Sequence, residues 1–265
     1  MILELEHIYK DYMQGSMEVH ILKDISLAVA EGEYLAVMGP SGSGKTTLMN
    51  IIGCLDKPTS GTYHLNGEDV LSYSDNELSD TRLYNIGFVF QSFHQLPKQT
   101  ALENVYLPLI YAGVSKKERI ALATEALERV GLGDRLHFRP TQLSGGQQQR
   151  VAIARTLALN PKIILLDEPI SALDVSMREV MKKELKDIQK RFNSTMIFIT
   201  HEQEEAFYLS DRIMVMSEGN IEQIDTPQNI YHHPANQYIR DFVNAHLDGK
   251  LESLCKCTGK QVYGK

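Results

Sequence analysis

The sequence has no tryptophan, only three cysteines and no long hydrophobic run. Cys54, Cys255 and Cys257 make no disulfide framework, and no companion cysteine or histidine cluster suggests zinc, so we expect reduced thiols. No apolar stretch approaches the roughly 18 residues that span a bilayer, and the first residues lack the charged and apolar regions of a signal peptide. We therefore expect a cytoplasmic protein whose membrane partners, if any, are separate chains.

A positive charge balance is lacking too. The chain carries 27 Lys and Arg against 34 Asp and Glu, a net charge of −7. Because a nucleic-acid binder needs a basic face, no nucleic-acid partner is expected. With 43% apolar residues over 265 positions, the chain can bury one substantial core. We expect one compound domain over 1–248 and a flexible tail over 249–265, where periodicity is lost.

The sequence does contain a glycine-rich loop between a predicted buried strand, Tyr34–Met38, and a helix-forming run, Thr47–Ile52. Glycines let successive N–H groups point inward, and the new helix adds the positive end of its dipole. The lysine can reach the outer phosphates of a nucleotide and the next hydroxyl can bind Mg²⁺. The strand and helix context disfavours a chance turn. The predicted phosphate site comprises Gly39, Ser41, Gly42, Ser43, Gly44, Lys45, Thr46 and Thr47.

Two further strands end in functional side chains. The predicted strand Ile163–Leu166 is followed by Asp167 and Glu168, and Thr195–Thr200 is followed by His201. In open α/β sheets, ligands gather at the carboxyl ends of the strands. Asp167 suits a Mg²⁺ ligand, directly or through water, and Glu168 can orient and deprotonate an attacking water. A lone histidine is more often structural or merely exposed, but the place of His201 after a third parallel strand favours a contact to the γ-phosphate or that water.

The segment Leu143-Ser-Gly-Gly-Gln147 begins another predicted helix with small residues, a second anion site of the same kind. Together with the phosphate loop and Asp167-Glu168, it resembles the ATP-binding subunits of ABC transporters, and the resemblance runs over roughly 1–243. It implies a head-to-tail dimer with two ATP molecules between the subunits. Ser144, Gly145 and Gly146 would then cap the γ-phosphate held by the other copy's Lys45, and Gln147 would join them in binding the nucleotide.

The same resemblance assigns three more positions. Gln91 matches the glutamine that senses Mg²⁺ and water and transmits movement to a membrane partner, unless it is an ordinary polar residue at a strand end. Asp174, in Ser-Ala-Leu-Asp, matches the loop that crosses the dimer interface. Tyr12 stands where the family stacks an aromatic ring on adenine, although a half-buried strand tyrosine is the alternative.

The expected fold class is α/β, with a P-loop NTPase (RecA-like) core, an N-terminal antiparallel β-subdomain and an inserted helical subdomain at about 92–157. Alternating residues predict strands over Leu3–Tyr9 and Val19–Val29, and turn pairs flank Thr62–Leu65. Helices are predicted over Ala101–Leu109, Lys116–Val130, Gln147–Leu159, Pro227–Tyr231 and Gln237–Val243. The apolar stretch Phe93–Tyr111 can be subdomain core or a groove for a short helix of a membrane subunit, and we expect a mixture of the two.

The implied partners are a second copy or a homologous ATPase subunit and separate transmembrane permease subunits, which would hold the chain on the cytoplasmic face of the membrane. Residues 38–159 resemble ATPases of macrolide exporters and lipoprotein release, whereas the sequence after Asp167 resembles importer ATPases. The direction of transport therefore stays open. A membrane-coupled signalling or mechanical ATPase is the alternative. A soluble nucleic-acid or ribosome ATPase is disfavoured by the single cassette and the acidic charge.

Overall fold

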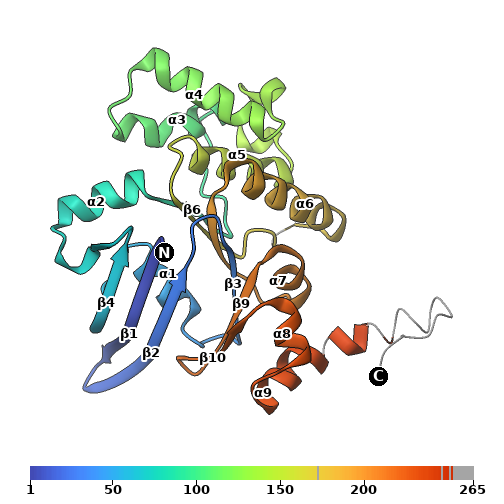
Figure 1. Cartoon of the computed structure of the whole chain (residues 1–265). Helices are drawn as coiled ribbons and strands as arrows, with labels where there is room; N and C mark the ends of the chain where they lie inside the picture. Colours follow the sequence, from blue (N-terminus) through green and yellow to red (C-terminus); the bar gives the residue numbers. More distant parts are fainter. Residues whose placement is uncertain (172, 246, 251, 253–265) are drawn as a thin grey trace.

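The computed structural model describes residues 1–171, 173–245, 247–250 and 252, so most of the tail predicted over 249–265 lies outside the described residues. Two β-sheets form the body of the molecule (Figure 1). The antiparallel sheet has the order β2-β1-β4-β5 and consists of β1 (Leu3–Gln14), β2 (Met17–Val29), β4 (Ser60–Leu65) and β5 (Glu68–Asp69). Its presence confirms the predicted N-terminal β-subdomain.

The second sheet has the order β10-β9-β3-β8-β7-β6. It contains β3 (Tyr34–Met38), β6 (Ile86–Val89), β7 (Ile163–Asp167), β8 (Thr195–Ile199), β9 (Arg212–Ser217) and β10 (Asn220–Asp225). Strands β6, β7, β8, β3 and β9 run parallel, and β10 pairs antiparallel with β9. This arrangement confirms the predicted α/β core, in which β3, β7 and β8 end at one edge.

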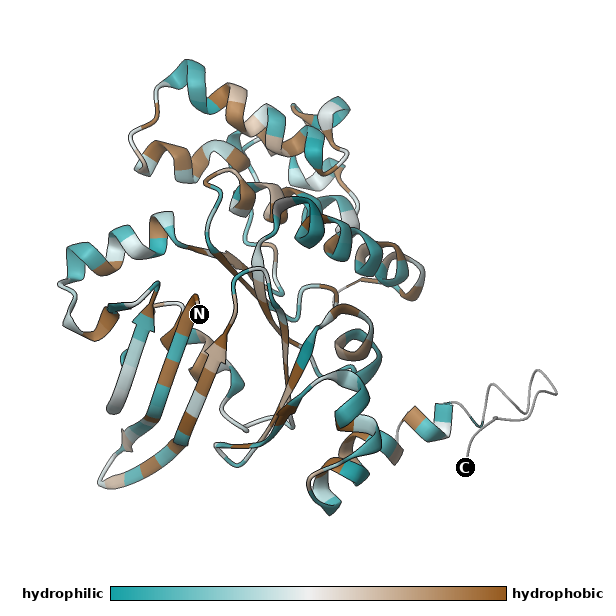
Figure 2. Cartoon of the chain, viewed as in Figure 1, coloured by the Kyte–Doolittle hydropathy of each residue, from teal (hydrophilic) through white to brown (hydrophobic). Residues whose placement is uncertain are grey.

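Each parallel strand is covered on both faces. In β3, Leu35 and Val37 belong to a core shared with the antiparallel sheet and α1 (Lys45–Ile52), whereas Ala36 and Met38 belong to a second core on the helical side. All five residues of β3 are buried. Strands of this kind are continuously apolar because neither face meets water. Figure 2 shows the contrast with β1 and β2, along which hydrophobic and hydrophilic residues alternate.

A helical lobe separates β6 from β7, which are neighbours in the sheet. It contains α3 (Ala101–Tyr111), α4 (Lys116–Arg129) and α5 (Gly145–Leu157), and Figure 1 shows it at the top, away from the antiparallel sheet. The first two helices agree with the predicted ranges to within two residues. Helix α5 begins two residues before the predicted Gln147, so Gly145 and Gly146 lie in its first turn.

The remaining helices are α2 (Asp75–Tyr84), α6 (Val175–Phe192), α7 (Gln203–Leu209), α8 (Pro227–His232) and α9 (Gln237–Ile239), which continues into a π-helical turn over Arg240–Asn244. Helices α2, α6 and α7 were not predicted. Along α2 only Leu78 and Thr81 are buried, so its apolar periodicity is weak. Within the described residues, no helix combines the length and hydropathy of a membrane span.

Candidate nucleotide-binding site

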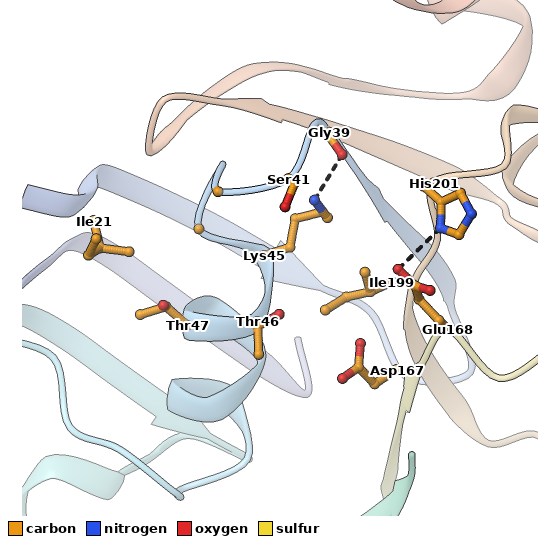
Figure 3. A pocket seen from close by; sticks show the side chains of 12 residues that line it. Ile21, Gly39, Ser41, Lys45, Thr46, Thr47, Asp167, Glu168, Ile199 and His201 are labelled. Atoms are coloured by element: carbon orange, nitrogen blue, oxygen red, sulfur yellow. Dashed lines mark hydrogen bonds and ion pairs between the residues drawn. The ribbon is translucent and has the colours of Figure 1, made fainter. Parts of the chain in front are cut away.

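A pocket of about 430 Å³ lies at the carboxyl ends of β3, β7 and β8 (Figure 3). It joins the glycine-rich loop with the three polar residues predicted to follow β7 and β8. The lining residues are Ile21, Gly39, Ser41, Gly42, Gly44, Lys45, Thr46, Thr47, Asp167, Glu168, Ile199 and His201. The parallel arrangement of the strands therefore brings together segments far apart in the sequence.

The loop needs glycine at defined positions. Gly39, Gly42 and Gly44 have φ angles of 152°, 81° and 97°, in the region that side chains rarely adopt. A Cβ on Gly39 would lie 2.2 Å from the carbonyl oxygen of Met216, and one on Gly44 would lie 2.7 Å from Leu22 Cδ2. A Cβ on Gly42 would meet open space, so this glycine is required by backbone conformation alone. The loop therefore keeps its backbone N–H groups close to the pocket.

Lys45 is the cation of the pocket. Its Nζ donates hydrogen bonds to the carbonyl oxygens of Gly39, at 2.8 Å, and Pro40, at 2.7 Å. Burial lowers the pKa of Lys45, while Glu168 and Asp167 oppose that shift. The side chain thus holds the loop closed around itself, at a place where phosphate oxygens can replace the two carbonyls as acceptors.

Three loops place polar groups around Glu168. Its Oε1 is 3.1 Å from His201 Nδ1, and its Oε2 is 3.4 Å from Gln91 Nε2. The same Gln91 nitrogen donates to Ser171 Oγ at 3.1 Å. Glu168 itself has a φ of 45°, so its backbone is in the left-handed region. A carboxylate between a histidine and an amide can accept a proton from a water molecule at this edge of the sheet.

Asp167 ends β7 and is half-buried in the pocket wall. Burial and the neighbouring Glu168 raise the pKa of Asp167, and Lys45 opposes the shift. Thr46 lines the same pocket. A carboxylate and a hydroxyl are hard oxygen donors, the type that Mg²⁺ prefers.

Tyr12 lies on β1 beside the pocket and is not among its lining residues. Its hydroxyl donates to Asp56 Oδ2 at 2.5 Å, and Lys10 Nζ lies 4.7 Å from the ring centre. Burial and Asp56 raise the pKa of Tyr12 to about 12, against a smaller opposing effect of the Thr47 hydroxyl. Sequence reasoning missed Lys10 and Asp56, because neither stands in a motif and the second is far along the chain.

The predicted capping residues Ser144–Gln147, called the signature segment below, do not line the pocket of their own chain. Ser144 caps α5: its Oγ accepts from Gln147 N at 3.3 Å, and Gln147 Oε1 accepts from Ser144 N at 3.0 Å. A Cβ on Gly146 would lie 2.3 Å from Met177 Cε, and one on Gly145 would contact Leu173 at 3.4 Å. The signature segment therefore packs against the beginning of α6.

Asp174 caps α6. Its Oδ1 accepts from Met177 N at 3.0 Å and from the Ser176 hydroxyl at 2.7 Å. These hydrogen bonds lower the pKa of Asp174. The side chain is thus occupied within its own chain, by the backbone of Met177, whose own side chain lies against Gly146.

Fold and pocket together define a P-loop ATPase. Residues 22–171 match the ABC transporter family, and the chain belongs to that family. It is 49% identical over 220 residues to the uncharacterized ABC transporter ATP-binding protein YknY of Bacillus subtilis, covering 83% of this chain and 95% of that protein. It is 42% identical over 264 residues to the spermidine/putrescine import ATP-binding protein PotA of Thermobifida fusca, covering 99% of this chain and 67% of that protein.

The fold has also been observed experimentally. The ATP-binding cassette MJ0796, solved as a dimer with ADP and Pi, superposes with a TM-score of 0.76 at 42% identity, over 85% of this chain and 98% of that one. The chain is thus an ATP-binding and ATP-hydrolysing subunit that powers an ABC transporter. Macrolide export proteins and PotA both occur among its relatives, which confirms the mixed resemblance.

Proposed function

We propose that each ATP is bound between two copies of the chain. The phosphate loop of one copy, Gly39–Thr47, would hold the phosphates, and Ser144–Gln147 of the other would cap the γ-phosphate. The observation that carries this proposal is the separation within one chain: the exposed N-terminus of α5 contributes nothing to its own pocket. Asp174 would meet the partner beside that cap, and Tyr12 would stack on adenine.

Mg²⁺ fits the oxygen donors of this pocket. The Thr46 hydroxyl and the Asp167 carboxylate would bind it, with Gln91 approaching from the loop after β6. Within the described part of the chain, no hydrogen-bond donor occupies the Asp167 carboxylate, so its oxygens are available. When bound, the ion supplies positive charge that neutralises the β- and γ-phosphate oxygens.

The chain's own residues would then promote hydrolysis by position and charge. Glu168 would orient a water molecule and take its proton while the water oxygen attacks the γ-phosphorus, with ADP as the leaving group. His201 contacts Glu168 and would hold the carboxylate and the γ-phosphate in line. Lys45 would stabilise the charge that develops on the phosphate oxygens. Gln91 contacts Glu168 and would relay movement of its loop.

A groove of about 320 Å³ between α3 and β6 is the proposed docking site for a permease helix. Leu107, Pro108 and Tyr111 line it on one side and Phe88 on the other, and Tyr111 is 75% exposed. Val105 and Leu109 of the same stretch are buried in the lobe. The proposal therefore assigns Phe93–Tyr111 both to the lobe's core and to the docking groove. Docking there would place the ABC domain, 1–248, on the cytoplasmic face of the membrane.

Sedimentation with Mg·ATP tests the shared site. The Glu168→Gln variant is expected to form a dimer only with ATP and to lose turnover by on the order of 100-fold or more, because the amide binds water without accepting its proton. Lys45→Ala is the matched control, since it should stay monomeric with ATP. A Glu168→Gln chain that hydrolysed ATP at the wild-type rate would contradict the assignment of the base.

A further inference from the structure

Arg178, in the first turn of α6, contacts two loops of the site at once. Its Nε donates to the carbonyl oxygen of Leu173 at 2.9 Å and its Nη2 to that of Ser171 at 3.0 Å. Its Nη1 is 3.5 Å from Glu202 Oε1. The first two acceptors follow Glu168 along the chain, and the third is adjacent to His201. The Arg178 side chain thus joins the segment that carries Glu168 to the segment that carries His201.

We propose that Arg178 is a positioning residue for ATP hydrolysis, which fixes the distance between Glu168 and His201. The proposal rests on the roles given above to those two residues. Arg178 does not line the pocket, so its action is exerted through the loops that it holds.

The segment after Glu168 needs such support. A φ of 45° is unfavourable for glutamate and persists only where the surroundings determine it. Ser171 stabilises this segment by two hydrogen bonds. Its Oγ donates to the Glu168 carbonyl at 3.0 Å and accepts from Gln91 Nε2 at 3.1 Å. Arg178 holds Ser171 from the other side, through the serine carbonyl. Loss of the guanidinium would therefore weaken the hydrogen bonds of Ser171 to both Glu168 and Gln91.

The second loop is anchored independently to the core. Glu202 N donates to Thr200 Oγ1 at 3.0 Å, and that hydroxyl donates to Glu205 Oε2 at 2.6 Å. Thr200 and Glu205 are both buried. The Glu202 carboxylate also lies 4.0 Å from His201 Nε2. Glu202 is held in place by its hydrogen bond to the buried Thr200. Its ion pair with Arg178 therefore connects the loop after Glu168 to the core of the protein.

The geometry favours arginine over any other cation. Three acceptors lie in different directions around Arg178, and a planar guanidinium can donate to all of them from fixed positions. A lysine ammonium is a single point on a flexible stem. Charge alone therefore cannot replace the side chain, which makes Arg178→Lys a discriminating variant.

The test is steady-state hydrolysis of Mg·ATP by the full chain. Arg178→Lys and Arg178→Met are each expected to lower kcat by roughly 10-fold or more, since misplaced catalytic groups cost about that much. KM for ATP should change by less than about threefold, because phosphate-loop contacts are intact. Arg191→Met is the matched control on the same helix, since Arg191 Nη1 donates to the Arg129 carbonyl at 3.1 Å, away from the site.

The outcomes separate this proposal from the proposed function. If Arg178→Lys retained kcat within about twofold of the Arg191→Met control while Glu168→Gln was inactive, the positioning role would be wrong and the shared-site function would stand. A rise in KM without a fall in kcat would also overturn it. If the melting temperature of Arg178→Met lay below that of the Arg191→Met control, the kcat of Arg178→Lys would decide whether Arg178 has the positioning role. Turnover in Glu168→Gln would instead contradict the proposed function.

As a second measurement, Glu202→Gln keeps an acceptor and removes the charge. The double variant Arg178→Met/Glu202→Gln should lose no more kcat than Arg178→Met alone, because residues that act as one unit are not additive. Fully multiplicative losses would show that the ion pair does not transmit the effect.

Discussion

At the scale of single residues, Glu168 is held by groups that the sequence places far from it. His201 and Gln91 flank its carboxylate, and the Glu168–Gln91 contact joins positions 77 apart. The three loops that carry them follow β6, β7 and β8, which are neighbours in the sheet. A short-range change in any one loop thus alters the surroundings of the same carboxylate.

Tyr12 offers a test of base recognition. Tyr12→Leu is expected to raise KM for ATP about tenfold with little change in kcat, because stacking on a base is worth roughly 1–3 kcal/mol. Tyr12→Phe keeps the ring and removes only the hydrogen bond to Asp56. Steady-state kinetics of both variants checks this. Equal KM values for the leucine and phenylalanine variants would show that the ring does not stack.

The residues of the site divide into those that a motif reveals and those that only contact reveals. Lys45, Asp167 and Glu168 were predicted because each follows a buried strand at a fixed spacing, and the structure brings all three to one pocket. Asp56 and Arg178 were missed, since each acts through a contact with no local sequence pattern. Such contacts depend on how elements pack, which strand and helix signals do not encode.

At the scale of elements, α2 shows where pattern reading fails and capping chemistry could have succeeded. Its apolar periodicity is weak, but Ser74 and Glu77 form a capping box: Ser74 N donates to Glu77 Oε2 at 2.8 Å, and Glu77 N to Ser74 Oγ at 3.4 Å. The buried parallel strands β3, β7 and β8, by contrast, were predicted to within one residue at each end, because continuous apolar runs bounded by polar site residues leave few alternatives. No strand was predicted over β9.

Removal of this cap has a predictable cost. Ser74→Ala should lower the free energy of unfolding by about 1 kcal/mol, since a helix N-terminus loses its side-chain acceptor, and ATP turnover should be unchanged. Asp80→Ala, at an exposed position in the same helix, is the control and should change stability by no more than about 0.5 kcal/mol. Urea unfolding of both variants measures the difference. Equal stabilities would mean that the cap contributes nothing.

At the scale of the whole molecule, a shared site predicts complementation between two inactive chains. Lys45→Ala removes the phosphate contact and Ser144→Arg blocks the cap, so each alone should be inactive. In a mixed dimer both defects fall in one site and the other site is intact. Equal mixing is therefore expected to restore up to about a quarter of wild-type ATPase activity, if subunits pair at random and sites act independently.

The control is a mixture of Lys45→Ala with Glu168→Gln. Both changes lie in the pocket of their own chain, so every site in every dimer keeps one defect and no activity should return. If the Lys45→Ala and Ser144→Arg mixture also stayed inactive while each chain was folded, the two segments would not belong to one composite site.

The attachment of the helical lobe has a mechanical consequence. The chain leaves the sheet after β6 and returns at β7, its immediate neighbour, where Lys162 N and Ile163 N both donate to the Asn85 carbonyl. Because β6 and β7 run parallel, the chain leaves at the carboxyl end of β6 and returns at the amino end of β7, beside the start of β6. Both attachments therefore belong to the strand pair at the edge of the sheet, and β8 separates that pair from β3, which leads to the phosphate loop. A load on the lobe thus reaches the loops of Gln91 and Glu168, which follow this strand pair, before it reaches Lys45.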